Sequence, residues 1–78
     1  PLVAAKLAAQ VSTERLTARE SEILGLMGAG ASNKAIARRL GISEGTVKTH
    51  VKSVLQKLEV ASRTEAVSLA ARRGLIQL

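Results

Sequence analysis

The spacing of apolar residues divides the chain into short helical segments separated by polar or glycine-containing stretches. In most segments the apolar side chains recur every three or four residues, which places them on one face of an α-helix. No segment alternates apolar and polar residues over a useful length, so the sequence predicts no β-sheet. We therefore expect an all-α fold: a small bundle of four core helices that contains a helix-turn-helix, with an extra linker helix at the N-terminus.

Capping residues and glycines mark where the first and fourth core helices begin and end. Thr17 and Glu20 have the spacing of a capping box, in which the side chain of each residue accepts a hydrogen bond from the backbone N–H of the other. Ser62 and Glu65 have the same spacing, and Gly74 follows as a residue that ends the helix. The sequence therefore predicts two helices, each opened by a capping box.

Residues 32–58 (SNKAIARRLGISEGTVKTHVKSVLQKL) predict the second and third core helices, joined by the short turn of a helix-turn-helix. Ser32 and Ser43 are placed to cap these helices, and Gly41 can adopt the left-handed backbone conformation that ends the first of them. Ala37 provides a small side chain where the two helices approach each other. The residues expected to be buried in the shorter helix are Ala35, Ile36 and Leu40.

The longer helix of this pair has one apolar side and one polar side. At about 100° per residue, the apolar side consists of Val47, Val51, Val54, Leu55 and Leu58. The opposite side consists of Gly45, Thr49, Lys52, Ser53 and Gln56, with Lys48 on its flank. A polar side on the second helix of a helix-turn-helix is typical of a helix that enters the major groove of DNA.

Positive charge is concentrated in the predicted helix-turn-helix. The chain of 78 residues has a formal charge of +6. Between positions 29 and 58 the one acidic residue is Glu44, and the basic residues are Lys34, Arg38, Arg39, Lys48, Lys52 and Lys57. This pattern is expected for contact with a phosphate backbone, whereas a merely solvated basic surface would intersperse glutamates. The chain has no Phe, Tyr or Trp to stack on unpaired bases, which favours duplex DNA over single strands.

The composition argues against an enzyme. The chain has no Cys, no Asp and one His, so neither a nucleophile–base pair nor a cluster of metal ligands is expected. We therefore expect no catalytic residue, no metal and no cofactor. No apolar run approaches the roughly 20 residues of a membrane span, and the lack of cysteine is compatible with the cytoplasm. A start at Pro1 without Met fits either a piece of a longer protein or removal of the initiating Met.

Residues 16–76 resemble the LuxR-type helix-turn-helix domain, and within that group the output domains of NarL/FixJ response regulators. The most specific matching pieces are LTARE, SNKAIA, ISEGTVKTHV, RTEAV and the closing GLI. Glu59 departs from the Gly or Asn that often stands at its position, which leaves the shape of that corner open. The chain accordingly divides into an N-terminal linker or helix, residues 1–15, and a LuxR-type domain, residues 16–78.

The resemblance implies that the domain binds double-stranded DNA as a dimer, with the third core helix in the major groove. Carried over by position, it makes Lys48, Thr49 and Lys52 the residues that read the groove. Helical spacing selects the last two independently and adds Ser53 and Gln56 on the same side. The two lines of reasoning therefore agree on the surface that meets the bases.

The resemblance also implies phosphate contacts at the start of the second helix, from Ser32, Asn33 and Lys34. A helix N-terminus offers free N–H groups and a favourable dipole to an anion, which makes this placement physically reasonable. Thr46 is a weaker candidate for a phosphate contact, because it can instead cap its own helix together with Ser43.

The fourth core helix carries more apolar surface than one core requires. Its apolar residues spread over about 200°, compared with the roughly 100° of a helix that packs on one core. The excess fits the dimerisation role that the resemblance implies, with Val67, Leu69 and Ala71 as the candidate contacts. Because an 8.2 kDa domain offers little area, we expect a homodimer that is weak without DNA.

Two other functions remain open at this point. One is a protein-interaction or dimerisation module resembling region four of sigma factors, which shares the helix-turn-helix. The other is the output domain of a quorum-sensing regulator. Since the chain contains no Asp, the phosphoacceptor of a response regulator would lie in a domain outside this chain. RNA polymerase is a further candidate partner.

Three polar residues outside the candidate DNA-binding set are considered singly. The capping box is expected to account fully for Glu20. Arg63 either pairs with a carboxylate within the domain or contacts a phosphate, and the sequence does not separate these. His50 lies at the edge of an apolar helix face, where packing or hydrogen bonding is the expected role.

Overall fold

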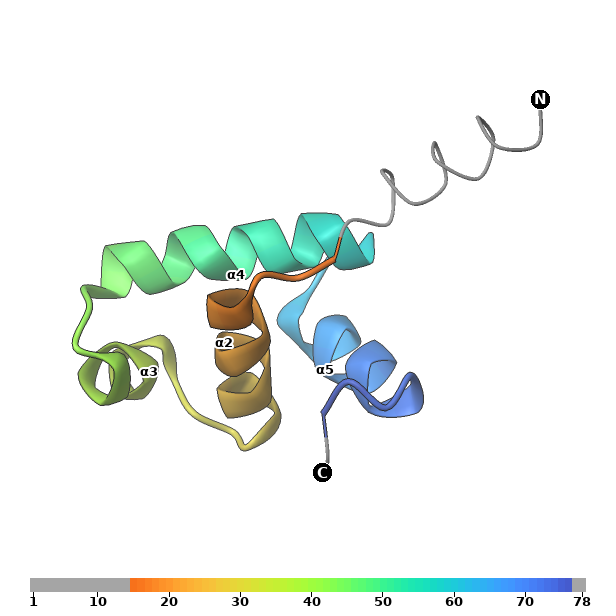
Figure 1. Ribbon diagram of the computed structural model, residues 1–78, viewed down its shortest axis with the longest axis horizontal. Helices are drawn as coiled ribbons and strands as arrows, with labels where there is room; N and C mark the ends of the chain where they lie inside the picture. Colours follow the sequence, from red (N-terminus) through yellow and green to blue (C-terminus); the bar gives the residue numbers. More distant parts are fainter. Residues whose placement is uncertain (1–14, 77–78) are drawn as a thin grey trace.

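The computed structural model describes residues 15–76, and over this range the chain folds into four α-helices without a strand. The helices are α2 (Ala18–Gly28), α3 (Asn33–Leu40), α4 (Glu44–Leu58) and α5 (Arg63–Arg72) (Figure 1). The predicted all-α fold with four core helices is thereby confirmed. The linker helix predicted near the N-terminus lies outside the described residues.

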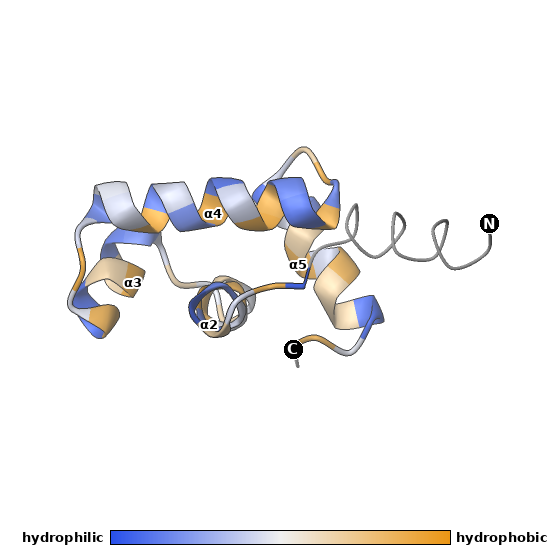
Figure 2. Ribbon diagram, turned by 45° about the horizontal axis from the view of Figure 1, so that its top comes forward, coloured by the Kyte–Doolittle hydropathy of each residue, from blue (hydrophilic) through white to orange (hydrophobic). Residues whose placement is uncertain are grey.

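The longest helix, α4, forms one side of the domain, and the other three helices lie along it. In Figure 1, α3 lies beneath the N-terminal end of α4, α2 beneath its middle and α5 beneath its C-terminal end. All three pack against α4, and α2 also packs against α5. Hydrophobic and hydrophilic residues mix along α4 (Figure 2), as expected for a helix with one covered and one open side.

One apolar cluster lies where the four helices meet. Its buried members are Ile23, Leu24, Met27, Ile36, Ala37, Val47, Val54, Leu58, Ala66 and Ala70. The apolar side predicted for α4 is confirmed, since three of its residues are buried and Val51 and Leu55 pack against the cluster half-buried. Burial of these side chains removes apolar surface from water, which is the main force that holds the helices together.

The buried side of α3 differs from the predicted one. Ile36 is fully buried as expected, Leu40 is half-buried, and Ala37 is buried where the two helices were expected to approach each other, but Ala35 is exposed. The two alanines lie about 100° to either side of Ile36, and the core covers only the side of Ala37 and Leu40. The expected burial of Ala35 was therefore wrong.

The first predicted capping box is present and the second is only half formed. At the start of α2, Thr17 N–H donates to Glu20 Oε1 at 2.8 Å and Glu20 N–H donates to Thr17 Oγ1 at 3.1 Å. At the start of α5, Glu65 N–H donates to Ser62 Oγ at 3.2 Å. The Glu65 carboxylate instead accepts at 3.5 Å from the N–H of Ala61, one residue before the cap. The second prediction was therefore wrong in its reciprocal bond.

Two helices end in the left-handed backbone conformation. Gly41 ends α3 with a φ of 68°, as its sequence position predicted. Glu59 ends α4 with a φ of 57°, and it is the non-glycine residue with positive φ among residues 15–76. The corner left open by the sequence thus keeps the shape that a glycine would favour, at a conformational cost to the glutamate.

Candidate nucleic-acid interface

The open side of α4 presents polar side chains that make few contacts within the domain. Lys48, Thr49, Lys52 and Gln56 are all exposed, on the side away from the buried Val54. Neither Lys48 nor Lys52 forms an ion pair with any residue of the described range. Their charges are therefore available to an external anion, and no helix of this range covers them.

Thr49 has a fixed orientation within this surface. Its hydroxyl donates to the Gly45 carbonyl at 3.1 Å, one helical turn earlier. This bond uses the hydroxyl proton on the helix backbone. The side chain therefore offers an external partner a methyl group and an acceptor oxygen in place of a donor.

Ser53 does not belong to this surface, contrary to the prediction from helical spacing. It is half-buried, and its hydroxyl donates to Glu20 Oε2 at 2.6 Å. The residue lies at the border between the two sides of α4, next to Val54, where α2 packs against the helix. The carboxylate of Glu20 draws the serine toward the interior, so Ser53 is removed from the groove-facing set.

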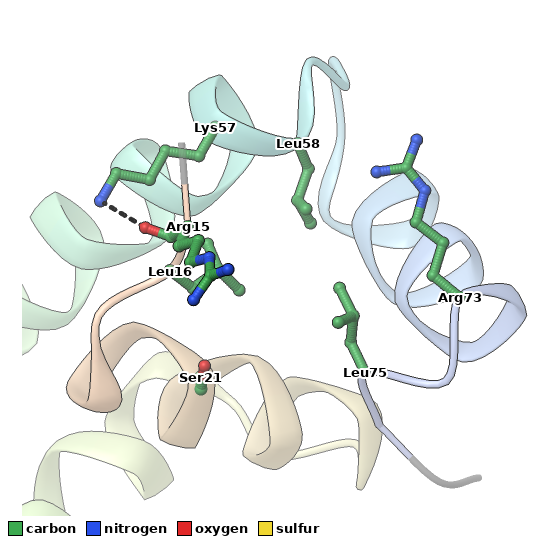
Figure 3. Close-up of a pocket in the computed structure, with 7 residues that line it drawn as sticks. All are labelled: Arg15, Leu16, Ser21, Lys57, Leu58, Arg73 and Leu75. Atoms are coloured by element: carbon green, nitrogen blue, oxygen red, sulfur yellow. Dashed lines mark hydrogen bonds between the residues drawn. The ribbon is translucent and has the colours of Figure 1, made fainter. Parts of the chain in front are cut away.

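Lys57 also points into the domain. Its ammonium lies 2.8 Å from Glu20 Oε1 and donates to the Arg15 carbonyl at 3.4 Å, the bond drawn in Figure 3. The lysine side chain is 17% exposed and the glutamate side chain 6%. The charge of Lys57 is thus balanced internally and does not add to the basic surface. The sequence had indicated that the capping box accounts fully for Glu20. The contacts with Ser53 and Lys57 show that it accounts for only part of the role of this residue.

The environment of Glu20 favours its charged form. Burial alone would raise the pKa of the carboxyl group, because a charge loses solvation in the interior. Hydrogen bonds from Lys57, Ser53 and the Thr17 backbone outweigh burial and lower the pKa from 4.5 to about 2. The group is therefore an ionised structural anchor between α2 and α4 at neutral pH.

The start of α3, at the opposite end of this helix from the turn at Gly41, offers N–H groups without an acceptor in the helix. Ser32 caps the helix, since its hydroxyl accepts from Ala35 N–H at 3.1 Å. The first N–H groups of any α-helix, here those of Asn33 and Lys34, have no acceptor within the helix. Lys34 is exposed and forms no ion pair in the described range. The three predicted phosphate-contacting residues therefore lie together at one helix end.

Thr46 is already engaged at the start of α4. Its hydroxyl lies 2.9 Å from the Ser43 hydroxyl, and its N–H donates to the same serine oxygen at 3.0 Å. This is the capping role that the sequence offered as the alternative to a phosphate contact. Thr46 is nevertheless exposed, so one hydroxyl of the pair can still reach a partner.

Arg63 forms no ion pair with a carboxylate of residues 15–76, which was one of the two roles proposed from the sequence. Its Nη1 donates to Asn33 Oδ1 at 2.7 Å, and its Nη2 donates to the Ala31 carbonyl. The arginine, the first residue of α5, therefore holds the start of α3 from a distance of about thirty residues in sequence. Helical periodicity gives no signal for this contact, since it describes only neighbours within one helix.

The candidate dimer residues of α5 are partly occupied by their own domain. Val67, Leu69 and Ala71 are all half-buried, and the first two pack against the core. At about 100° per residue, Val67 and Ala71 share one edge of α5, whereas Leu69 lies on the other edge. A hollow of about 400 Å³ beside Val67 is also lined by Met27 and Thr64.

A second hollow lies at the far end of α4 from α3, between the start of α2 and the residues after α5 (Figure 3). It has a volume of about 400 Å³, and Leu16, Leu58 and Leu75 form its apolar lining. Leu75 is 51% exposed, and among residues 15–76 no other large apolar side chain is classed as exposed.

No helix in the described range is long and apolar enough to cross a bilayer.

Comparison with known proteins places these features in context. The profile of "Bacterial regulatory proteins, luxR family" matches residues 14–70. The chain is 52% identical over 71 residues to the nitrate/nitrite response regulator protein NarL of Escherichia coli K12, covering 85% of this chain and 33% of that protein. It is 53% identical over 64 residues to the response regulator protein VraR of Staphylococcus aureus, covering 82% and 31% respectively. The chain thus spans about a third of the length of these curated relatives.

Two solved structures share the arrangement of helices. The response regulator ChrA of a heme-sensing two-component system matches with a TM-score of 0.76 and 46% identity, over 97% of this chain and 39% of that chain. The transcription factor GerE matches with a TM-score of 0.75 and 40% identity, over 80% of this chain and 92% of that chain. These similarities do not favour a protein-interaction module, and the matching family is one of regulatory proteins, which is not an enzyme class.

Proposed function

Because the chain belongs to the luxR family of bacterial regulatory proteins, whose helix-turn-helix domain binds DNA, we propose that α4 reads a specific duplex sequence in the major groove. The observation that carries this proposal is the open side of α4. It presents two lysines that form no ion pair within residues 15–76, and it lies opposite the core. The adjacent start of α3 supplies the backbone contacts that hold the helix in register.

The side chains on α4 suit different features of the base edges. Lys48 and Lys52 can donate to the acceptor atoms of guanine, the commonest target of basic side chains in the major groove. The outward methyl group of Thr49 suits contact with the methyl group of thymine. Gln56, further along the same side, can offer a donor and an acceptor to adenine, or bind the backbone at the edge of the groove.

The start of α3 would bind the phosphate backbone without reading sequence. Ser32, Asn33 and Lys34 combine free N–H groups, the positive end of the helix dipole and one exposed ammonium. Thr46 adds a hydroxyl at the start of α4. Contacts of this kind position the protein on DNA and make binding depend on salt.

Two copies would bind together through α5. We assign the contact to the edge that carries Val67 and Ala71, because its neighbours Thr64 and Ser68 are uncharged and the guanidinium of its one charged neighbour, Arg63, is bound to Asn33 and the Ala31 carbonyl. The edge that carries Leu69 has charged neighbours, and the centres of protein interfaces are depleted of charge. Both apolar residues already contact their own domain, so little area remains and the pair would be weak until DNA aligns it.

The chain would serve as the output domain of a longer bacterial response regulator that acts in the cytoplasm. Its similarity to NarL and VraR supports this. Since the chain contains no aspartate, the phosphoacceptor would lie outside it. We keep the domain boundaries expected from the sequence, with residues 1–15 as linker and residues 16–78 as the DNA-binding unit. RNA polymerase is the expected partner of the DNA-bound dimer.

Selection of bound duplexes from a random pool tests the proposal. We expect the recovered sequences to contain paired short half-sites about one helical turn, or 10 bp, apart, since a symmetric dimer places two recognition helices at that spacing. Binding of selected and scrambled duplexes should then be compared at physiological salt. Equal affinity for the two would contradict sequence-specific recognition.

A further inference from the structure

The guanidinium of Arg63 joins α5 to the start of α3. Its two donors reach Asn33 Oδ1 and the Ala31 carbonyl, which lie on either side of the capping residue Ser32. Within residues 15–76, no other side-chain hydrogen bond links these two segments. This one side chain therefore adds a direct polar link between the α3 N-terminus and α5 to the packing of both helices on α4.

The contact with Arg63 also determines which way the amide group of Asn33 faces. A guanidinium has N–H donors and no acceptor, so the amide atom that meets it must be the oxygen. The amide nitrogen of Asn33 donates to no residue of the described range. No side-chain N or O atom in this range is both buried and without a hydrogen-bond partner, so this unpaired nitrogen is not buried. The NH₂ group therefore reaches solvent with its hydrogens unused.

We propose that Arg63 is a positioning residue for DNA binding: it holds the Asn33 amide so that the NH₂ group, and not the oxygen, meets a backbone phosphate. This inference rests on the phosphate contact proposed above for the start of α3. Phosphate oxygens only accept hydrogen bonds, so an amide that turned over would present its oxygen and lose the contact. Arg63 thus acts through Asn33 and does not itself contact DNA.

Asn33→Asp separates this role from a purely structural one. An aspartate keeps the oxygen that accepts from Arg63, and a negative charge is favourable in the first turn of a helix, so the free energy of unfolding should not fall. The substitution removes the NH₂ donor and places a negative charge beside the phosphate. We expect about tenfold weaker binding to every duplex at low salt. Because the added charge alone repels DNA, Asn33→Ala, which removes the NH₂ donor without adding a charge, is measured beside it; unchanged binding of Asn33→Ala would show that Asn33 donates to no phosphate.

A double-mutant cycle tests whether Arg63 acts through Asn33. Arg63→Met keeps the length of the side chain and removes its donors, and we expect it to weaken binding about two- to tenfold. In an Asn33→Ala background the same substitution should have no further effect. Arg72→Met, at the exposed end of the same helix, is the matched control and should bind like the wild type. If circular dichroism shows that Arg63→Met is unfolded, Arg63→Lys takes its place in the cycle.

The outcomes distinguish this inference from the proposed function. Losses that add in the double variant, together with a smaller salt slope for Arg63→Met, would show that the arginine contacts a phosphate itself and would overturn the inference. Lys34→Ala serves as the reference for the backbone contact. If it weakens binding while the Asn33 variants do not, only the inference on Arg63 fails. If it has no effect either, the proposed contact at the start of α3 fails.

Discussion

The carboxylate of Glu20 uses both oxygens inside the domain. One accepts from the Thr17 backbone and from Lys57, and the other accepts from Ser53. A glutamine at this position preserves the capping box but replaces the charged carboxylate beside the largely buried ammonium of Lys57 with a neutral amide. We expect Glu20→Gln to lower the free energy of unfolding by about 1–3 kcal/mol in urea titrations at pH 7.

Glu22→Gln is the matched control for this prediction. Glu22 is paired with Arg19 at 3.3 Å, and both side chains are about half exposed. Exposed ion pairs contribute little, so we expect a change below about 0.5 kcal/mol. Equal losses in the two variants would show that the internal ion pair of Glu20 has no special weight.

The low pKa of Glu20 predicts how stability depends on pH. Its value falls from 4.5 in the unfolded chain to about 2 in the fold, so the ionised carboxylate stabilises the folded state. This contribution is fully present above about pH 5.5 and is lost as the pH falls through 4.5 toward 2. The difference in unfolding free energy between the wild type and Glu20→Gln should therefore shrink over that window. A difference that stays constant down to pH 2.5 would contradict the assignment.

Residue roles that depend on near neighbours could be predicted from the sequence, whereas those that depend on tertiary contacts could not. The caps Thr17 and Ser32 involve residues three positions apart, and the structure confirms both. Ser53 and Lys57 meet Glu20 across 33 and 37 residues, a separation for which helical spacing carries no information. Spacing therefore placed Ser53 on the open polar side and gave no sign that Lys57, counted among the basic residues of the motif, is bound within the domain.

At the level of helices, two ends share a backbone conformation but carry different residues. Gly41 (φ 68°) suits the left-handed region, whereas Glu59 (φ 57°) pays a steric penalty there. We expect Glu59→Gly to raise the free energy of unfolding by up to about 1 kcal/mol, and Gly41→Ala to lower it by about 1 kcal/mol. A methyl group at Gly41 would meet no atom within 4 Å, so only the backbone strain counts there. Thermal unfolding measures both, and changes of the same sign would contradict this reading of the corners.

The limits of prediction at this level come from equivalent positions. The period of α3 correctly placed Ile36 in the core and the motif placed Ala37 at the helix contact, but Ala35, on the other side of Ile36, was wrongly expected to be buried. The side of α4 that packs on the core was predictable because it contains five aliphatic residues. A long aliphatic pattern fixes a helix face, and two alanines do not.

At the level of the whole molecule, the two edges of α5 give a matched test of dimerisation. Val67→Glu and Leu69→Glu each place a charge on a half-buried position, so their costs to monomer stability should be similar. We expect only Val67→Glu to abolish cooperative binding to a duplex with two half-sites, with single-site affinity unchanged. Sedimentation and circular dichroism verify that both variants remain folded. Equal cooperativity in the two would remove the Val67 edge from the interface.

The central claim is that α4 reads bases while the start of α3 binds the backbone. The most direct measurement compares the base preference and salt dependence of wild type, Lys52→Ala and Lys34→Ala on a selected duplex and its single-base-pair variants. We expect Lys52→Ala to lose about 1–3 kcal/mol of discrimination at one base pair. Lys34→Ala should weaken all duplexes alike and reduce the salt slope by about one unit. A changed base preference in Lys34→Ala, with none in Lys52→Ala, would contradict the account.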